Sequence, residues 1–224
     1  MEKFRIQVFV GTPQRLPESG RISAIAKQAV FNRVWVSQNG LAGDEQADLQ
    51  VHGGPDKAVH IYAADHYGAL AARFPQPRRR AWSPGVLGEN LSVTGLSEDG
   101  VCLGDTWRWG EVLLQVCQPR MPCWKIDEQM GEDGVARYID EMHFTGWYCR
   151  VLQAGFASEG DTLELVARPA LSITLAQALQ TCARHPPDAD ALNGLANAEG
   201  IAPKWASKIK QRAAYLLRSN RVGP

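Results

Sequence analysis

The sequence predicts a mainly β domain, folded as a closed or nearly closed barrel with a few flanking helices, followed by a small all-α domain of three helices. Three observations predict it: many short strand-like runs before residue 169, only brief helical spacing among them, and sustained helical spacing afterwards. We place the boundary at Pro169, which divides the chain into a barrel domain, residues 1–169, and a C-terminal domain, residues 170–224.

Strand-like segments dominate the first 169 residues. Runs of β-branched, aromatic and alternating apolar residues are typical of short strands, and they cover residues 4–10, 106–109, 112–118, 147–152 and 162–166. Gly110 and Glu111 separate two of these runs and predict a tight hairpin, because glycine tolerates the positive φ of a two-residue turn. Helical spacing occurs here at residues 65–73 and 135–142.

Three helical segments follow the boundary, at residues 175–183, 188–198 and 203–219. Pro203 suits the first turn of the last helix, and Gly200 suits the position just past the end of the helix before it. Apolar residues recur on one face of the last helix, at positions 205, 209, 213 and 216. This stripe indicates packing, against the barrel, a partner protein or a second copy in a homo-oligomer.

The balance of charge argues against large anionic partners. The chain has 24 Lys and Arg against 24 Asp and Glu, so no global field attracts nucleic acid or a membrane. We therefore interpret Arg78–Arg80 as a solvated loop and predict no stable nucleic-acid binding. The first ten residues lack the apolar core of a signal peptide, and no run reaches the roughly 18 apolar residues of a membrane span. Five cysteines without CxxC spacing predict free thiols in a reducing, cytoplasmic compartment.

Cys123 is the strongest candidate for chemistry. It lies in the segment Gln118–Lys125, directly after a predicted strand, where two prolines restrict the backbone. Arg120 and Lys125 are close in sequence, and nearby cations favour the thiolate, the form that attacks electrophiles and binds metals. The alternative is an inert buried cysteine beside a tryptophan. The pattern leaves open whether a reactive thiol would be a nucleophile or a metal ligand.

Two further segments supply candidate ligand contacts. After His52, the glycines Gly53 and Gly54 would let backbone N–H groups approach a ligand, and Lys57 would supply a charge for a phosphate. Asn90 is a candidate for contacting a polar ligand edge. The histidines have neither HExxH nor zinc-finger spacing. The chain also lacks Walker, GxGxxG, GxSxG and ferredoxin patterns, which argues against a P-loop, a Rossmann site, a hydrolase elbow and an intrinsic iron–sulfur cluster.

Four motifs, taken in order, resemble the MOSC domain family (molybdenum cofactor sulfurase C-terminal domain), specifically its YiiM-type branch. They are Gly40–Gln46, His52–Tyr62, Gly88–Leu91 and Gln118–Lys125, and they span most of residues 40–125. The resemblance implies a MOSC-type β-barrel that binds the molybdenum cofactor, molybdopterin, with Cys123 as the catalytic thiolate and the protein ligand of molybdenum. It also implies a small three-helix C-terminal domain. Pyridoxal phosphate is not expected.

The same resemblance implies an activity, the reductive detoxification of N-hydroxylated compounds such as hydroxylaminopurine-type base analogues. Reduced molybdenum would accept the oxygen of the N–OH group, and a separate electron-donor reductase would restore the metal. Two alternatives stay open: a persulfide carrier that works through Cys123, and a non-enzymatic protein that binds or delivers the cofactor. The candidate cofactor contacts are Lys57, Arg120 and Lys125, with His52, Gly53, Gly54 and Asn90 as secondary candidates.

Overall fold

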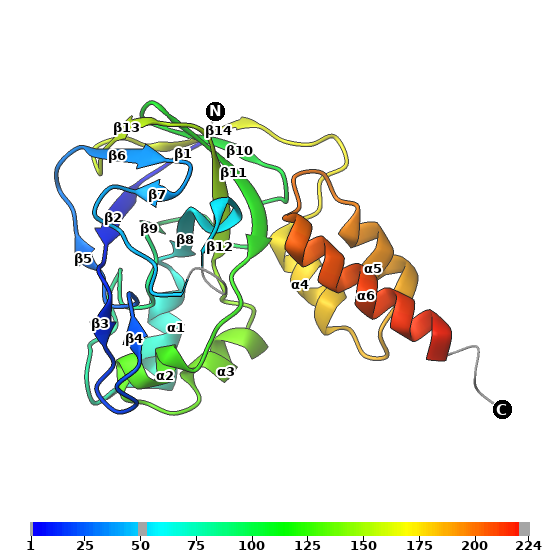
Figure 1. The fold of residues 1–224 in the computed structure, drawn as a ribbon, viewed down its shortest axis with the longest axis horizontal. Helices are drawn as coiled ribbons and strands as arrows, with labels where there is room; N and C mark the ends of the chain where they lie inside the picture. The colour runs from blue at the N-terminus through cyan, green and yellow to red at the C-terminus, as the bar shows by residue number, and fades with distance from the viewer. Residues whose placement is uncertain (1, 49–52, 220–224) are drawn as a thin grey trace.

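The computed structural model describes residues 2–48 and 53–219 and shows a sheet-rich body with helices at one end and along one side (Figure 1). Nine strands form the main sheet, in the order β1-β14-β10-β11-β12-β8-β9-β2-β5. Neighbouring strands are antiparallel except for the parallel pair β8 and β9. The bounds are β1 Lys3–Phe4, β2 Ile6–Val10, β5 Gln28–Ala29, β8 Val59–Ala63, β9 Leu91–Val93, β10 Thr106–Trp109, β11 Val112–Pro119, β12 Trp147–Gln153 and β14 Leu163–Ala167.

Two smaller sheets complete the β structure. One has the order β13-β6-β7, and the other pairs β3 with β4. The hairpin predicted at Gly110 is confirmed, since β10 pairs with β11 from Thr106 opposite Gln115 to Trp109 opposite Val112. The short strands were not predicted from the sequence. Their bounds are β3 Gln14–Arg15, β4 Ile22–Ser23, β6 Val34–Ser37, β7 Gly40–Leu41 and β13 Gly155–Ala157.

The mainly β architecture agrees with the prediction, but the strand pairing among the described residues does not close into a barrel. The order of the main sheet ends at β1 on one side and β5 on the other. The N-terminal run approaches both sides, because β1 pairs with β14 while β2 pairs with β9. Arg5 separates these two strands, and its carbonyl accepts a hydrogen bond from the Thr94 amide at 3.2 Å. This interruption splits one predicted strand into two that belong to different ladders.

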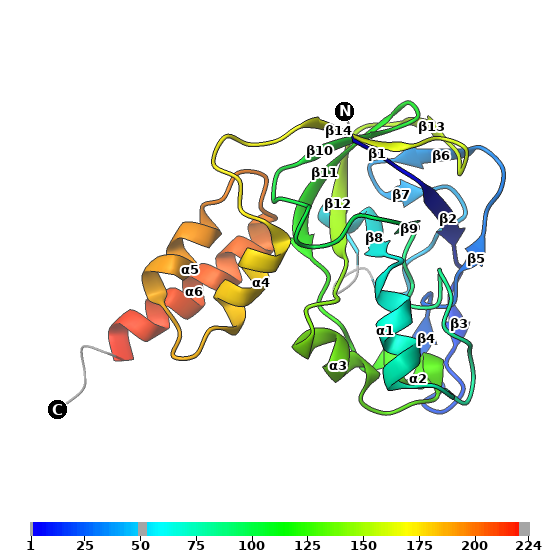
Figure 2. The ribbon, with the colours of Figure 1, turned by 180° about the vertical axis from the view of Figure 1, so that it is seen from behind.

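Three helices cover one end of the sheet, as Figure 2 shows from behind. They are α1 His66–Arg73, α2 Lys125–Met130 and α3 Val135–Glu141, and a 3-10 turn, η1, spans Pro55–Lys57. A second hydrophobic core lies among these helices, and it includes Leu70, Ile126 and Ile139, each fully buried. The sequence predicts α1 and α3, whereas the six residues of α2 are too few for helical spacing to be visible.

The C-terminal helices are α4 Leu175–Ala183, α5 Ala189–Ala196 and α6 Pro203–Ser219, and they lie beside β11 (Figure 1). Their bounds agree closely with the predicted segments. Thr174 begins α4 with a capping box, in which its side chain accepts from the Gln177 amide and the Gln177 side chain accepts from the Thr174 amide. None of the helices in residues 2–48 and 53–219 is long and apolar enough to cross a membrane.

The C-terminal helices share the main hydrophobic core with the sheet. Leu175, Leu192 and Ile209 belong to the same buried cluster as Val116 of β11. The Ala202 amide donates to the Cys117 carbonyl at 2.8 Å, which ties the start of α6 to this strand. The apolar stripe of α6 therefore packs inward. Residues 170–224 as a separate domain stay a prediction, because the core is continuous across the proposed boundary.

Candidate functional site

One cleft brings together most of the residues that the sequence singles out. Its volume is about 620 Å³ including the solvent at its mouth, and it opens where the loop after β11, the turn before β8 and the segment between β4 and β5 meet. Among the residues that line it are Ser23, Ile25, Lys27, Asp44, Lys57, His60, Leu87, Asn90, Arg120, Cys123, Lys125 and Tyr148.

The loop that carries Cys123 connects β11 to α2. At its start, the Arg120 amide donates to the Gly146 carbonyl at 3.0 Å. At its end, the Cys123 carbonyl accepts from the Ile126 amide at 3.0 Å, which holds the cysteine against the first turn of α2. Cys123 is half-buried and lines the cleft. The five cysteines form no disulfide, and Cys123 alone among them lines this cleft.

Arg120 is one of two buried cations of the site, the other being Lys27. The Arg120 side chain lies inside the protein, and Nη2 donates to the Leu87 carbonyl at 3.3 Å. Burial, followed by the charge of Arg120, holds the pKa of His60 well below its usual value, so that the imidazole is neutral at neutral pH. Burial raises the pKa of Tyr148, and Arg120 opposes that rise. Tyr148 therefore keeps its phenol proton and can donate a hydrogen bond into the cleft.

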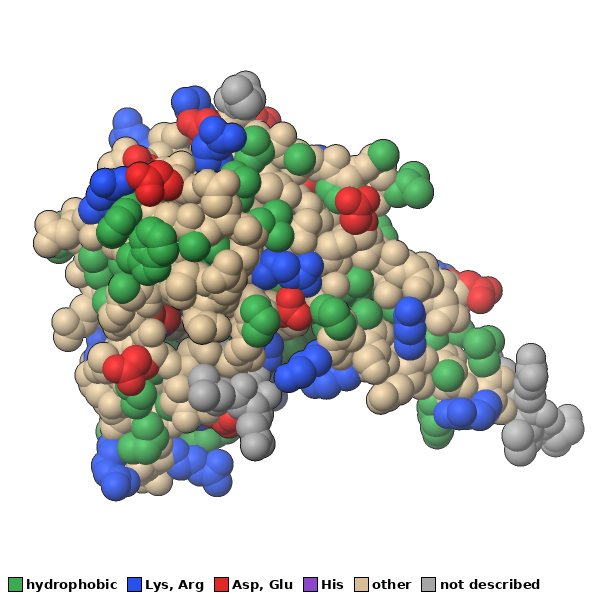
Figure 3. Space-filling model, turned by 45° about the horizontal axis from the view of Figure 1, so that its top comes forward, with side chains coloured by type: hydrophobic (Ala, Val, Ile, Leu, Met, Phe, Trp, Pro, Cys, Tyr) green, Lys and Arg blue, Asp and Glu red, His purple; other side chains and the backbone are tan. Residues whose placement is uncertain are grey.

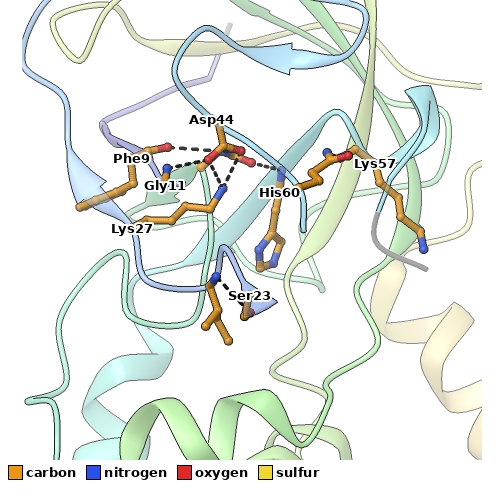
Figure 4. Close-up of polar contacts among 10 residues, drawn as sticks. Phe9, Gly11, Ser23, Lys27, Asp44, Lys57 and His60 are labelled. Atoms are coloured by element: carbon orange, nitrogen blue, oxygen red, sulfur yellow. Dashed lines mark hydrogen bonds and ion pairs between the residues drawn. The ribbon is translucent and has the colours of Figure 1, made fainter. Parts of the chain in front are cut away.

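A buried ion pair forms one wall of the cleft (Figure 4). Lys27 Nζ lies 2.8 Å from each carboxylate oxygen of Asp44, and both side chains are more than 90% buried. The same carboxylate accepts from the Gly11 amide and from Asn90 Nδ2, each at 2.8 Å. Burial lowers the pKa of Lys27, and the Asp44 charge opposes this effect. The pair thus compensates two charges that would be costly to bury alone.

Asn90 joins the ion pair to β8. Its Oδ1 accepts from the His60 amide at 3.0 Å, while Nδ2 donates to Asp44 and, at 3.3 Å, to the Phe9 carbonyl. These contacts use both ends of the amide within the protein, so Asn90 positions the wall of the cleft. A direct contact between Asn90 and a ligand stays a prediction.

Lys57 approaches the cleft from the side opposite Lys27, with His60 between them in the view of Figure 4. Its Nζ lies 5.8 Å from the centre of the Tyr148 ring. Partial burial lowers the pKa of Lys57, and the charges of Lys208 and Lys204 on α6 lower it further. Figure 3 shows Lys and Arg side chains gathered where the C-terminal helices meet the sheet.

The predicted site residues are not all in the cleft. Lys57, Asn90, Arg120, Cys123 and Lys125 line it. Gly53 is buried and Gly54 is exposed with a φ of 101°, and neither lines the cleft. His52 lies outside the described residues. Lys27, Asp44, His60 and Tyr148 are among the lining residues that the sequence does not single out as site residues.

Signals for the missed residues were weak. Asp44 follows Gly43 within the Gly40–Gln46 motif, and such a Gly-Asp pair is typical of a turn. His60 lies within the His52–Tyr62 motif but has no metal-site spacing. Lys27 is a lone cation in the run Ile25–Ala29, where burial cannot be inferred from spacing.

The donor set of the cleft fits an anionic ligand that brings its own metal. Within the described parts of the chain, no group of three or more His, Cys, Asp or Glu side chains could hold a metal ion. A single thiol, Cys123, faces a cleft that also contains Lys57, Arg120 and Lys125. A metal whose other ligands come from an organic anion could use this one thiolate, because nearby cations favour both the thiolate and the anion.

Comparison with known proteins gives the class of protein. Residues 48–164 match the MOSC domain model. Protein YiiM of Escherichia coli (strain K12) is 37% identical over 210 residues, covering 94% of this chain and 92% of that protein. The uncharacterized protein YflK of Bacillus subtilis is 33% identical over 217 residues, covering 96% of this chain and 94% of its own length. This chain belongs to the MOSC domain family.

Solved structures agree with this assignment. The crystal structure of YiiM from Escherichia coli superposes with a TM-score of 0.80 at 29% identity, and the match covers 96% of this chain and 94% of that one. A protein named "Reductase" from Gibberella moniliformis is 38% identical over 166 residues, which cover 73% of this chain and 29% of that protein. Membership in the MOSC domain family fits a cofactor-binding, enzyme-like role.

Proposed function

We propose that this protein is a molybdenum-cofactor-dependent reductase of N-hydroxylated compounds, for example hydroxylaminopurine-type base analogues, and that Cys123 is the protein ligand of the metal. The proposal draws on membership in the MOSC family and on the reductase name of one relative. The observation that carries it is the cleft, in which one half-buried thiol stands among three candidate anion contacts, Lys57, Arg120 and Lys125.

The choice of Cys123 rests on a contrast with the other cysteines. Cys117 and Cys149 are fully buried, and burial raises the pKa of both thiols, that of Cys117 to about 12. They therefore stay protonated, whereas a metal ligand must be a thiolate. Burial also raises the pKa of Cys102 and Cys182, and neither of them lines the cleft.

The remaining residues would bind and orient. The guanidinium of Arg120 can hold a phosphate or pterin oxygen with parallel N–H groups, and the less buried Lys57 and Lys125 add further positive charge. Tyr148, with its raised pKa, would donate a hydrogen bond without losing its proton. Because its pKa is lowered, His60 would stay neutral and would not place a second positive charge beside Arg120. When bound, the cofactor would supply a metal that accepts the oxygen of the N–OH group.

The overall reaction requires a separate source of electrons. Cleavage of the N–O bond consumes two electrons and two protons and yields an amine and water. A separate electron-donor reductase would supply the electrons. The protons would come from solvent, which reaches the open mouth of the cleft.

The test is reduction of a hydroxylaminopurine by protein from a host that makes the cofactor, with a chemical reductant as electron source. Cys123→Ser is expected to lose the activity, because a hydroxyl is a poor substitute for a thiolate on the metal. Cys182→Ser is the matched control, since Cys182 is also half-buried but lies on α4. Unchanged reduction by the Cys123→Ser variant would refute the assigned role.

The same preparations separate the two alternatives. A sulfur carrier would hold a persulfide on Cys123, visible by mass spectrometry, and would contain no molybdenum. A delivery protein would bind the cofactor and pass it to an apo-enzyme while N–OH reduction stayed at background. Either result would replace the reductase proposal.

A further inference from the structure

A second cavity adjoins the cleft. Its volume is about 510 Å³ including the solvent at its mouth, and Ser23 and Ile25 line both spaces. The remaining lining comes from strand β3 and the turn after it, from Ala26, from α2 and from the loop between α1 and β9. We call the part of this loop that contains Arg78, Arg79 and Arg80 the arginine loop. Neither Cys123 nor any of the lysines and arginines of the cleft lines this cavity, so the two spaces have different chemistry.

The charge of this second cavity is positive. Three arginines line it, Arg15, Arg79 and Arg80, and no Asp or Glu is among the described residues that line it. Arg79 is partly neutralised by Glu18, at 2.5 Å, and Arg15 donates to the Gly20 carbonyl at 3.0 Å. Arg80 makes no hydrogen bond or ion pair with any described residue. Its whole guanidinium is therefore available to an anion.

The arginine loop is held in place by the end of α2. The Arg79 amide donates to the Met130 carbonyl at 3.1 Å, and Arg78 Nε donates to the Gly131 carbonyl at 2.7 Å. Arg79 Nη1 donates to the Glu128 carbonyl at 2.7 Å. Cations suit the C-terminal carbonyls of a helix. The predicted solvated loop is thus exposed but anchored, and the anchoring holds Arg80 at the cavity.

Gln129 provides an independent sign of a ligand. Gln129 lines the cavity and is only 6% exposed, yet its side-chain Nε2 is buried and has no hydrogen-bond partner among the described residues. Buried polar groups in native proteins are almost always paired. An amide N–H2 can only donate, so the missing partner must be an acceptor. An oxyanion satisfies both this donor and the arginine charge.

We propose that this cavity is a second anion-binding site, which takes a phosphate group through the guanidinium of Arg80 and the amide of Gln129. Leu16, Pro17 and Ile25 give it an apolar wall, which suits the organic part of a phosphate monoester. Since Ser23 and Ile25 line both spaces, occupancy of this site would also alter the wall of the Cys123 cleft.

Calorimetric titration with inorganic phosphate, adenosine monophosphate and adenosine tests the proposal. The cleft also contains cations, so the titrations are made on the wild type and on the Lys57→Ala variant, whose cleft should bind phosphate less tightly. In both backgrounds, Arg80→Ala and Gln129→Met are expected to weaken one phosphate site by at least about tenfold, because each removes a direct donor. Arg5→Ala is the control, since Arg5 is exposed and lines neither space.

Each outcome decides the proposal. Binding of both phosphate and the monophosphate identifies a free-phosphate site, and binding of the monophosphate alone identifies a monoester site; both support it. Affinities that do not change in Arg80→Ala and Gln129→Met, absence of any phosphate binding, or equal binding of adenosine would overturn it. Circular dichroism of each variant verifies folding, and Gln129→Met preserves the side-chain size so that a loss of affinity is not a loss of packing.

Discussion

Replacement of Asp44 by asparagine is expected to destabilise the protein by about 3–5 kcal/mol, the usual cost of leaving a buried charge without its partner. The carboxylate accepts from Lys27, Asn90 and the Gly11 amide, all at 2.8 Å, and both members of the ion pair are more than 90% buried. An amide cannot accept all of these bonds, and it leaves Lys27 in a wall of the cleft without an anion. The loss is a large share of a typical stability of about 5–15 kcal/mol.

The assay is chemical denaturation of the variant and of the double variant Lys27→Met with Asp44→Asn. Removing both charges should recover part of the loss, because no unpaired charge then remains buried. Glu141→Gln, which breaks the exposed pair between Arg137 and Glu141, should cause no measurable change. A loss below about 1 kcal/mol for Asp44→Asn, or a double variant less stable than the single one, would refute the reasoning.

The pH dependence of the Asp44→Asn variant has a definite sign. Burial lowers the pKa of Lys27, and Asp44 opposes this in the wild type. At pH values between the lowered pKa of folded Lys27 and the ordinary pKa of a lysine, the unfolded chain binds more protons than the folded one, so stability rises with pH. This pH range becomes wider when Asp44 is replaced by asparagine, because the pKa of Lys27 then falls further. The variant should therefore regain stability on the alkaline side more steeply than the wild type does.

Three further predictions concern the cleft and the contact between the C-terminal helices and the sheet. His60→Gln should flatten the loss of stability below about pH 6.5, a loss of up to about 1.4 kcal/mol per pH unit, because folded His60 stays neutral while the unfolded chain takes up a proton; parallel denaturation profiles would contradict this. Lys208→Gln should raise the pKa of Lys57 in an NMR titration by removing a like charge, and Lys210→Gln should not. Gly200→Ala should cost more than about 1 kcal/mol in thermal unfolding, since its Cβ would lie 2.4 Å from Gly104 Cα at a φ of +77°. The control Gly194→Ala, in open space on α5, should be neutral or stabilising.

The sequence predicts most of the regular elements because their signals are local. The hairpin at Gly110 and the helices α4, α5 and α6 are found where spacing and caps place them. Barrel closure is a non-local property that depends on how the two parts of the N-terminal run pair, and no pattern marks the interruption at Arg5. The shared core between the sheet and the C-terminal helices is equally invisible, because a change of periodicity marks a change of element type and not an edge of packing.

The candidate site divides in the same way. Cys123, Arg120 and Lys125 belong to one short segment, so sequence alone groups them. Lys27 and Asp44 come from distant segments and contact each other only in the folded chain. Asn90, predicted as a polar ligand contact, lines the cleft and has both ends of its amide engaged by the protein, an engagement that its sequence neighbours do not reveal. Sequence reasoning finds residues whose neighbours are local, and it misses those whose role depends on tertiary partners.

The molybdenum and pterin content of protein purified from a cofactor-producing host tests the central claim most directly. The wild type and Cys182→Ser should contain both components in near-equal amounts, and Cys123→Ser should have lost the metal while remaining folded by circular dichroism. Wild-type protein without molybdenum, or a Cys123→Ser variant that retains it at the wild-type level, would contradict the assignment of Cys123 as the metal ligand.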